Sequence, residues 1–250
     1  HAVNTALELD PDSSPAHQAL AYLLLNVEMD WTGAKVEAQR ALKLAPNDPS
    51  AQFDLSIALA TEGHVQQAVD LTREALVADP RHDGWYYWLA VYLAGLGRLD
   101  EARQAANTAI ALQPTADGYH GQLAIVEILQ GDDKAALAAA QQESPGLWHA
   151  TAVALALQFG ADPTAAEGAL KQLVDRFADQ GPYQIAGVYA LRRDPDNMFK
   201  WLDHAWTRRD PGIGYLLFDP FILRFQDDPR FAAFCKKVGL PTTTDAVAMP

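Results

Sequence analysis

Apolar positions along the chain recur at helical spacing, and the apolar stretches are interrupted at regular intervals by glycine or proline. One helix face, for example, would carry four apolar side chains: Leu20, Leu23, Leu24 and Val27. Residues of the same type recur 34 positions apart as the pairs Gly63 and Gly97, Ala68 and Ala102, Ala75 and Ala109, Pro80 and Pro114. Three more lie 34 positions before this set: Ala34, Ala41 and Pro46. A fixed period of this length is typical of an array of helix-turn-helix repeats.

The residue types at these positions explain the repeat. A glycine such as Gly63 ends a first helix, because it adopts a left-handed conformation at no steric cost. Small residues such as Ala68 and Ala75 let the two helices of a pair cross closely. A proline such as Pro80 ends the second helix, because it cannot continue the helical hydrogen bonds. The sequence therefore predicts antiparallel helix pairs that stack on one another.

This pattern resembles the tetratricopeptide repeat (TPR). The resemblance implies an all-α fold, a right-handed superhelical solenoid of antiparallel helix pairs over residues 1–211. The predicted pairs span about 14–45, 49–79, 83–113, 116–143, 147–178 and 182–209, and residues 1–11 match the end of a second helix as a half repeat. The spacing from Pro11 to Pro46 is 35, so one extra residue is expected in the loop near Met29. A half repeat at the start, and His rather than Met as residue 1, predict a fragment of a longer protein.

The C-terminal segment 212–240 is too apolar for a free tail, since its large apolar residues include Leu216, Leu217, Phe218, Phe221, Leu223, Phe225, Phe231 and Phe234. We expect it to fold back as a cap, with a final helix from about Pro229 to Val238 and Asp228 as its N-cap. A detachable docking segment is the alternative. Residues 241–250 have no pattern and are expected to form a flexible tail.

Two further stretches resemble the TPR region behind the signalling domains of bacterial class III adenylate cyclases and winged-helix transcriptional activators. The first is Met29-Asp30-Trp31, followed by Ala34, Glu37, Arg40-Ala41-Leu42 and Pro46-Asn47. The second begins at Tyr183-Gln184-Ile185-Ala186 and continues through Asp219-Pro220 to Asp227-Asp228-Pro229-Arg230-Phe231 and Gly239-Leu240-Pro241. Two departures are Arg193, where glycine is usual, and Met198, where alanine is usual; both are expected to loosen that helix crossing.

Composition narrows the classes of partner. Asp and Glu outnumber Lys and Arg by 32 to 19, a net charge of -13, which argues against binding nucleic acid or an anionic membrane surface and permits a basic protein partner. The single Cys235 excludes an internal disulfide. No apolar run is long enough to span a bilayer, and no signal peptide is visible. We expect a cytoplasmic location, or a periplasmic one if the parent protein carries an upstream membrane helix.

Catalytic and cofactor chemistry is not indicated. The seven histidines include no pair with the four-residue spacing of a helical metal site, and no phosphate-binding loop or GxSxG motif occurs. Most Asp-Pro pairs indicate helix starts or stops. His204, beside Trp201, is expected to be packed. We therefore expect no catalytic residue, metal or cofactor, and a polar pocket around His204 would revive an enzymatic interpretation.

In TPR-like arrays the first helix of each pair lines a concave groove, and this resemblance places seven residues there: Tyr22, Phe53, Ile57, Tyr87, Val91, Gly121 and Ile125. Exposed aromatic residues would anchor a partner segment. The alternative is that they pack on one another. Trp85, Trp88, Leu89 and Tyr92 share another face and are expected in the core. Asp54 and Ile57 stand where carboxylate-clamping TPR domains place Asn, so no such clamp is expected.

These observations favour a non-catalytic scaffold, the docking or sensory region of a bacterial signalling protein, which binds a protein or peptide segment in its groove. A self-association module that dimerises the parent protein is the rival. The two differ in mass: the first is a monomer until its partner is added, and the second is a homodimer alone.

Overall fold

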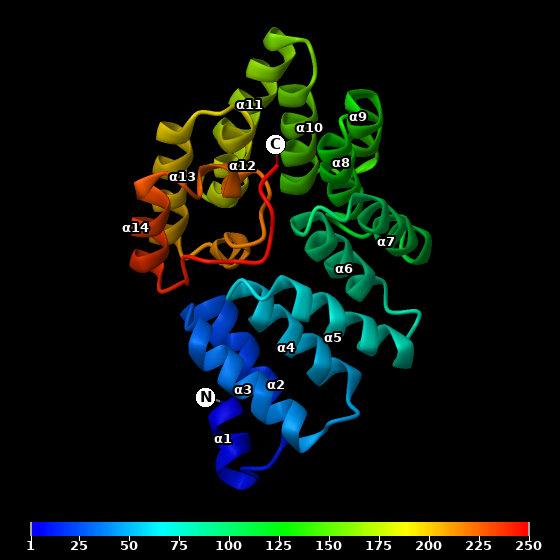
Figure 1. Ribbon diagram of the computed structural model, residues 1–250, viewed down its shortest axis with the longest axis vertical. Helices are drawn as coiled ribbons and strands as arrows, with labels where there is room; N and C mark the ends of the chain where they lie inside the picture. Colours follow the sequence, from blue (N-terminus) through cyan, green and yellow to red (C-terminus); the bar gives the residue numbers. More distant parts are fainter. Residues whose placement is uncertain (1, 250) are drawn as a thin grey trace.

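The computed structural model describes residues 2–249, which form helices, turns and irregular segments and contain no strand. Successive antiparallel helices stack into a curved array, with the two ends of the chain marked in Figure 1. The fold class predicted from the sequence, an all-α solenoid of helix pairs, is confirmed. The helices are α1 (Ala2–Leu9), α2 (Ser14–Leu23), η1 (Leu24–Glu28), α3 (Trp31–Leu44), α4 (Pro49–Thr61), α5 (Val65–Ala78), α6 (Asp83–Gly95), α7 (Leu99–Leu112), α8 (Tyr119–Gln130), α9 (Asp133–Gln142), α10 (Leu147–Phe159), α11 (Pro163–Phe177), α12 (Pro182–Leu191), α13 (Pro195–Arg208), η2 (Pro211–Tyr215), η3 (Ile222–Phe225) and α14 (Pro229–Val238).

In five of the six pairs the turn between the two helices uses a left-handed residue, whereas Gly160, between α10 and α11, has φ of -72°. Gly63, Gly97 and Gly131 have φ values of 85°, 70° and 86°. Met29 stands 34 residues before Gly63 and has φ of 55°, and Arg193 has φ of 60° in the last pair. A side chain in this region is strained, so the turn geometry is imposed there by the packing of the two helices.

The extra residue of the first pair lies in the helix and not in the loop. Residues Leu24–Glu28 form one π-helical turn directly before Met29. A π-turn takes up one more residue than an α-turn. The predicted position near Met29 is therefore corrected by a few residues, and the spacing of 34 between turn residues holds from Met29 to Gly131.

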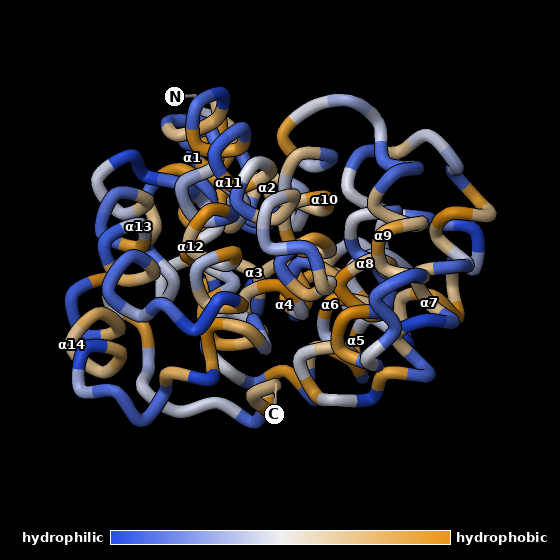
Figure 2. Tube along the Cα trace, turned by 90° about the horizontal axis from the view of Figure 1, so that it is seen from above, coloured by the Kyte–Doolittle hydropathy of each residue, from blue (hydrophilic) through white to orange (hydrophobic). Residues whose placement is uncertain are grey.

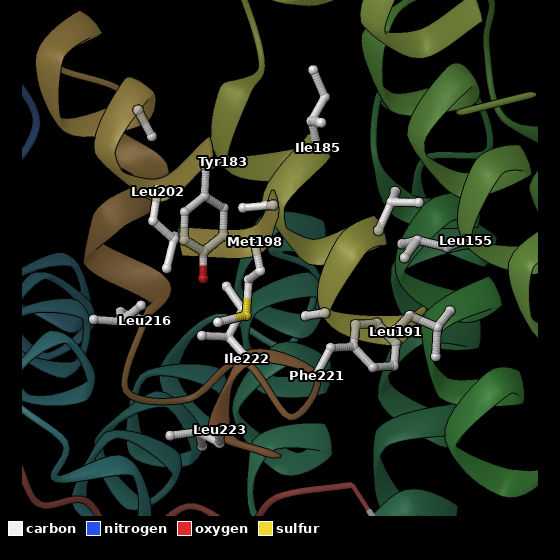
Figure 3. Packing of buried hydrophobic residues seen from close by; sticks show 14 of the residues in the cluster. Leu155, Tyr183, Ile185, Leu191, Met198, Leu202, Leu216, Phe221, Ile222 and Leu223 are labelled. Atoms are coloured by element: carbon white, nitrogen blue, oxygen red, sulfur yellow. The ribbon is translucent and has the colours of Figure 1, made fainter. Parts of the chain in front are cut away.

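Small residues occupy the helix crossings, as the repeat predicts. The side chains of Ala68, Ala75, Ala102 and Ala109 are fully buried. In the last pair the larger Met198 is also fully buried, next to Leu202 and Ile222 (Figure 3). The array therefore accommodates this departure by packing. Seen from above, the hydrophilic stretches of the chain follow the outer turns (Figure 2).

The array curves back so that its last elements meet the first pair (Figure 1). The indole Nε1 of Trp31 donates a hydrogen bond of 2.8 Å to the backbone oxygen of Val238. The guanidinium of Arg209 donates to the backbone oxygens of Val27 and Glu28 at 2.9 and 3.0 Å. Contacts between residues about 200 positions apart thus join the two ends of the solenoid.

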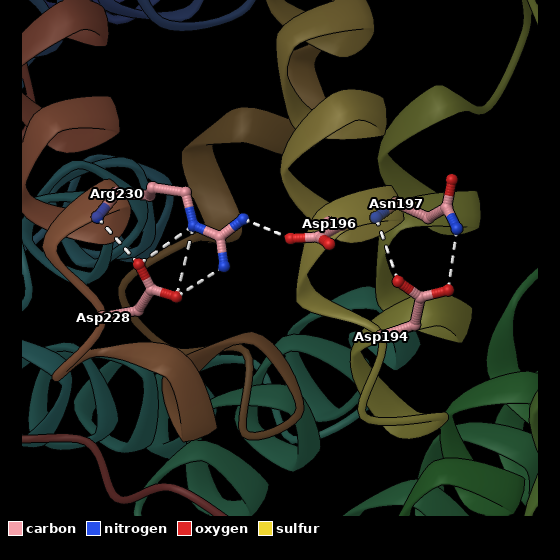
Figure 4. A network of polar contacts seen from close by, with 5 residues as sticks. All are labelled: Asp194, Asp196, Asn197, Asp228 and Arg230. Carbon is pink, nitrogen blue, oxygen red and sulfur yellow. Dashed lines mark hydrogen bonds and ion pairs between the residues drawn. The ribbon is translucent and has the colours of Figure 1, made fainter.

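Helix α14 packs beside α13 and closes the array. The Asp228 carboxylate accepts the backbone N–H of Arg230 at 2.9 Å and so caps the helix. The Arg230 side chain also binds Asp228 and reaches Asp196 of α13 at 2.6 Å (Figure 4). In the same view Asp194 caps α13 by accepting from the backbone and side chain of Asn197.

The chain after α14 differs from the predicted flexible tail. Pro250 and, at the other end, His1 lie outside the described residues. Within 241–249, Asp245 accepts the backbone N–H groups of Val65 and Gln66 at 2.7 and 3.0 Å, and so caps α5. The backbone N–H of Val247 donates a hydrogen bond of 2.7 Å to the backbone oxygen of Gly95. Residues 241–249 are therefore bound to the turns of two repeats. No local sequence pattern indicates these contacts.

Candidate functional site: a divided concave face

The seven predicted groove residues all line cavities on the concave face, but they do not form one continuous groove. Tyr22, Phe53 and Ile57 line one opening, which we call the N-terminal cleft. The other four line a second opening, which we call the central cavity: Tyr87, Val91, Gly121 and Ile125. The concave face therefore has two separate openings.

The division is made by the chain itself. Residues 211–225, from η2 to η3, cross the concave face, and we call them the closing segment. Tyr215 of this segment packs edge-on against Trp88 of α6, with ring centroids 5.3 Å apart and planes at 75°. Both residues line both openings, so this pair is the wall between them.

The closing segment is held in place by two half-buried carboxylates, those of Asp210 and Asp219. Asp210 accepts the backbone N–H groups of Gly212 and Tyr183 at 2.8 and 3.0 Å. Asp219 accepts those of Phe221 and Ile222 at 2.9 and 3.2 Å, and the Tyr183 hydroxyl at 3.2 Å. Burial raises the pKa of both carboxyl groups above the usual range, and the hydrogen bonds oppose that rise.

The N-terminal cleft has a volume of about 380 Å³ and lies between α2, α4 and η2. Its mouth carries Tyr22, whose side chain is 65% exposed. Phe53 and Ile57 of α4 are half-buried, one turn apart on the same helix face. The cleft is thus an apolar surface with an exposed aromatic residue at its edge.

Asp54 is the charged group of this cleft. It lies on α4 between Phe53 and Ile57, and its carboxylate makes no hydrogen bond or ion pair with the other residues of the described part of the chain. Burial, together with the nearby Asp48, raises the pKa of Asp54 from 3.8 to about 6. The cleft-lining residues include neither Lys nor Arg. At neutral pH the cleft therefore contains an ionised carboxylate without a countercharge.

The central cavity is smaller, about 120 Å³, and lies between α6, α8, α10, α12 and the closing segment. Its lining is mostly apolar and rich in aromatic residues. Figure 3 shows three of its lining residues, Leu155 of α10, Tyr183 of α12 and Phe221 of the closing segment. Burial, followed by the Glu143 carboxylate, raises the pKa of Tyr87 to about 12, so this phenol keeps its proton at neutral pH.

Glu143 fixes one side of the central cavity. It stands where the repeat predicts alanine, and its side chain is 3% exposed. Its carboxylate accepts the backbone N–H groups of Gly118 and Gly121, both at 2.8 Å. An acid at a helix N-terminus satisfies free N–H groups and the helix dipole. Glu143 therefore caps α8 from the end of the neighbouring helix and places Gly121 in the cavity wall.

Sequence reasoning missed several lining residues. Trp88, assigned to the core, is half-buried and faces both openings, whereas Trp85, Leu89 and Tyr92 are buried as expected. The repeat period could have placed Trp88 at the site, because Trp88 stands 34 residues after Asp54 and so occupies the equivalent position of the next repeat. The period does not place Tyr215, because this residue belongs to the closing segment and not to a repeat.

The titratable groups predicted to be packed or solvated can be placed within residues 2–249. This part of the chain contains no group of three His, Cys, Asp or Glu side chains placed to hold a metal ion. His204 lies on α13, edge-on to Trp201 and 3.2 Å from Asp179, and lines neither opening. Cys235 is buried, which raises the pKa of its thiol to about 11. Each helix in the described range is too short or too polar to cross a bilayer.

Comparison with known proteins identifies the repeats. Residues 29–83 and 58–117 match the tetratricopeptide repeat family. No curated protein matches the chain in sequence. Similar solved structures include the TPR protein TTC0263 of Thermus thermophilus, with 21% identity, TM-score 0.60 and coverage of 78% of this chain and 100% of that one. Another is PilW, a type IV pilus biogenesis factor, with 19% identity, TM-score 0.60 and coverage of 74% and 87%.

A chain of the APC/C hetero-tetramer Cut9–Hcn1 is also similar, with 18% identity, TM-score 0.62 and coverage of 89% of this chain. The present chain spans 44% of the length of that one. At these identities the likeness shows the fold alone. The chain thus contains TPR repeats within a helical solenoid, a fold that generally serves as a scaffold for protein–protein interactions.

Proposed function

We propose that this chain is a non-catalytic scaffold that binds a partner segment in the N-terminal cleft, and that the segment presents a basic side chain beside an apolar one. The observation that carries the proposal is Asp54, an ionised carboxylate without a countercharge on an apolar surface. Leaving such a charge half-buried costs free energy, and a Lys or Arg from a partner would remove that cost.

The neighbours of Asp54 support an apolar anchor next to the basic group. Phe53 and Ile57 flank the carboxylate on one helix face, and Tyr22 stands exposed across the cleft. Aromatic residues in a pocket are frequent energetic centres of interfaces. The net charge of -13 would also speed the approach of a basic partner.

The cellular role we propose is docking within a bacterial signalling protein. It is supported by the resemblance of the Met29-Asp30-Trp31 stretch and of the C-terminal segment to TPR regions of adenylate cyclases and winged-helix activators. Self-association is the alternative. The exposed apolar residues Leu9, Val36 and Val77 lie singly on different helices, whereas Tyr22, Leu23 and Val27 are exposed together on α2 and η1, where a second copy could make contact.

Selection of a random peptide library displayed on phage tests the binding proposal. We expect enriched peptides to carry Lys or Arg next to an aromatic or large aliphatic residue. Fluorescence anisotropy should then show that Asp54→Asn weakens a selected peptide about tenfold, as expected when a partner's charge loses its counterpart. Glu74→Gln, which removes an exposed charge on α5, is the matched control and should leave affinity unchanged.

Two results would refute the proposal: enrichment of acidic or uncharged peptides, or equal loss of affinity in both variants. Light scattering over a range of protein concentrations separates the rival. A monomer throughout agrees with a docking module, and a dimer that forms without added peptide favours self-association.

A further inference from the structure

The central cavity has a feature that packing does not require. Gly187 lies in the middle of α12, is buried, and lines this cavity. Apart from its two chain neighbours and the backbone of its own helix, no atom lies within 4 Å of the position that a Cβ would occupy there. Its φ is not in the left-handed region either. Glycine inside a helix is unfavourable compared with alanine, and here neither a close approach nor the backbone conformation calls for it. Because Gly187 has no side chain, the cavity contains open space at this position.

Buried polar groups without partners border the same space. Thr151 of α10 is 7% exposed, and its hydroxyl has no hydrogen-bond partner within residues 2–249. The Gln184 side-chain oxygen, one turn before Gly187, is also buried without a partner in that range. Buried polar groups are normally paired, so each is an unmet hydrogen-bonding site next to an apolar space.

The carboxylates near the cavity already accept hydrogen bonds from the protein. Glu143 is bound by two backbone N–H groups, and Asp219 by two more and by the Tyr183 hydroxyl. Lys and Arg are absent from the lining. Asp219 is the only charged residue of the lining within the described part of the chain, so an anion would be repelled by it and a cation would find no free carboxylate. The lining therefore suits an uncharged molecule.

From these observations we propose that the central cavity is a binding site for a small, uncharged aromatic molecule with one hydrogen-bonding group, held against Thr151 and Gln184. The volume of about 120 Å³ limits the bound part to roughly one ring, since an engineered cavity of about 150 Å³ takes up benzene. This site is separate from the N-terminal cleft, so the proposal does not depend on peptide binding there.

Phenol and toluene are suitable probes, because they share one ring and differ in the hydroxyl. Saturation-transfer NMR titrations on the whole chain should give a dissociation constant of about 1 mM or tighter for phenol. Toluene should bind about fivefold more weakly, the effect of one buried hydrogen bond. Thr151→Val keeps the shape of the side chain without its hydroxyl, and should lower the affinity for phenol toward that for toluene while leaving the affinity for toluene unchanged.

Gly187→Leu should fill the cavity and abolish binding of both probes. Gly168→Leu is the matched control, because Gly168 is an exposed glycine inside α11 with equally open space at its Cβ position. Gly187→Ala should fold at least as well as the wild type and weaken binding partially, so it keeps the test valid if the leucine variant does not fold. Circular dichroism checks the fold of each variant.

Three outcomes would overturn the proposal. The first is no saturable binding of either probe to the wild type. The second is binding that survives Gly187→Leu in a folded protein. The third is tighter binding of benzylammonium or benzoate than of phenol, because the site would then select a charged ligand.

Discussion

Asp54 offers the sharpest test of the electrostatics of the N-terminal cleft. Replacing it by Asn removes the charge and keeps the shape, so Asp54→Asn resembles the protonated acid at every pH. Because burial raises the pKa of Asp54 from 3.8 to about 6, the folded chain holds a proton in a pH range where the unfolded chain has released it. Stability therefore falls as pH rises through this window, and Asp54 destabilises the fold most above pH 6.

The size of the effect follows from the shift. About two pKa units correspond to roughly 2.7 kcal/mol at neutral pH. The cleft is open to water, which screens part of this cost, so we expect about 1 to 2 kcal/mol. Asp54→Asn should thus stabilise the chain by this amount at about pH 7 and by only about a fifth of it at about pH 4, where both residues are neutral in the folded chain and the unfolded Asp54 is about half ionised. The gain should appear between about pH 4 and pH 6.

Urea unfolding followed by circular dichroism, at four values from about pH 4 to pH 7, measures this difference. Glu74→Gln makes the same change in net charge at an exposed site and corrects for relief of the overall negative charge. A gain that is independent of pH, or that equals the gain of Glu74→Gln, would refute the assignment of a raised pKa to Asp54. So would a loss of stability at neutral pH, since it would require a countercharge that the cleft lining lacks.

Three further predictions concern stability. Glu143→Ala leaves two backbone N–H groups of α8 unpaired and should lower the free energy of unfolding by about 2 kcal/mol; a change in urea midpoint within error would contradict its role as a cap. Gly187→Ala should raise that free energy by about 0.5 to 1 kcal/mol, and a lower midpoint would mean that the space at its Cβ is occupied. Asp245→Ala should accelerate amide exchange at Val65 and Gln66 by about tenfold, whereas unchanged rates would show that the C-terminal residues do not cap α5.

Local sequence signals were sufficient to place the repeats. The period of 34 marked the left-handed turns at Gly63 and Gly97, and it also marks Met29, where no glycine is present. Asp-Pro at 228–229 marked the start of α14. These features depend on a few neighbouring residues, so propensity and spacing are enough to find them.

Long-range closure could not be predicted in the same way. The apolar density of 212–225 shows that this segment must be buried, but the sequence does not say against which surface. Tyr215 meets Trp88 across 127 positions (215 − 88 = 127). Asp245 accepts a hydrogen bond from the first residue of α5, Val65, across an even longer separation in sequence. Such pairings depend on the curvature of the whole array, and so the predicted groove residues line two openings where one continuous groove was expected.

The energetics of the closing segment decide which opening a partner can use. Seven of its apolar side chains are at most 2% exposed: Ile213, Leu216, Leu217, Phe218, Phe221, Ile222 and Leu223. Burial of each contributes about 1.5 to 3 kcal/mol, so full detachment would cost roughly 10 to 20 kcal/mol. Even reduced by about 40% for a compact unfolded reference, this approaches the roughly 8 kcal/mol of a micromolar complex. The free energy needed to detach the segment would therefore offset the whole binding free energy of a partner that displaced it. This cost disfavours the alternative of a detachable docking segment, and it is the reason that we propose partner binding at the N-terminal cleft, where Asp54 and Tyr22 line the opening without any rearrangement.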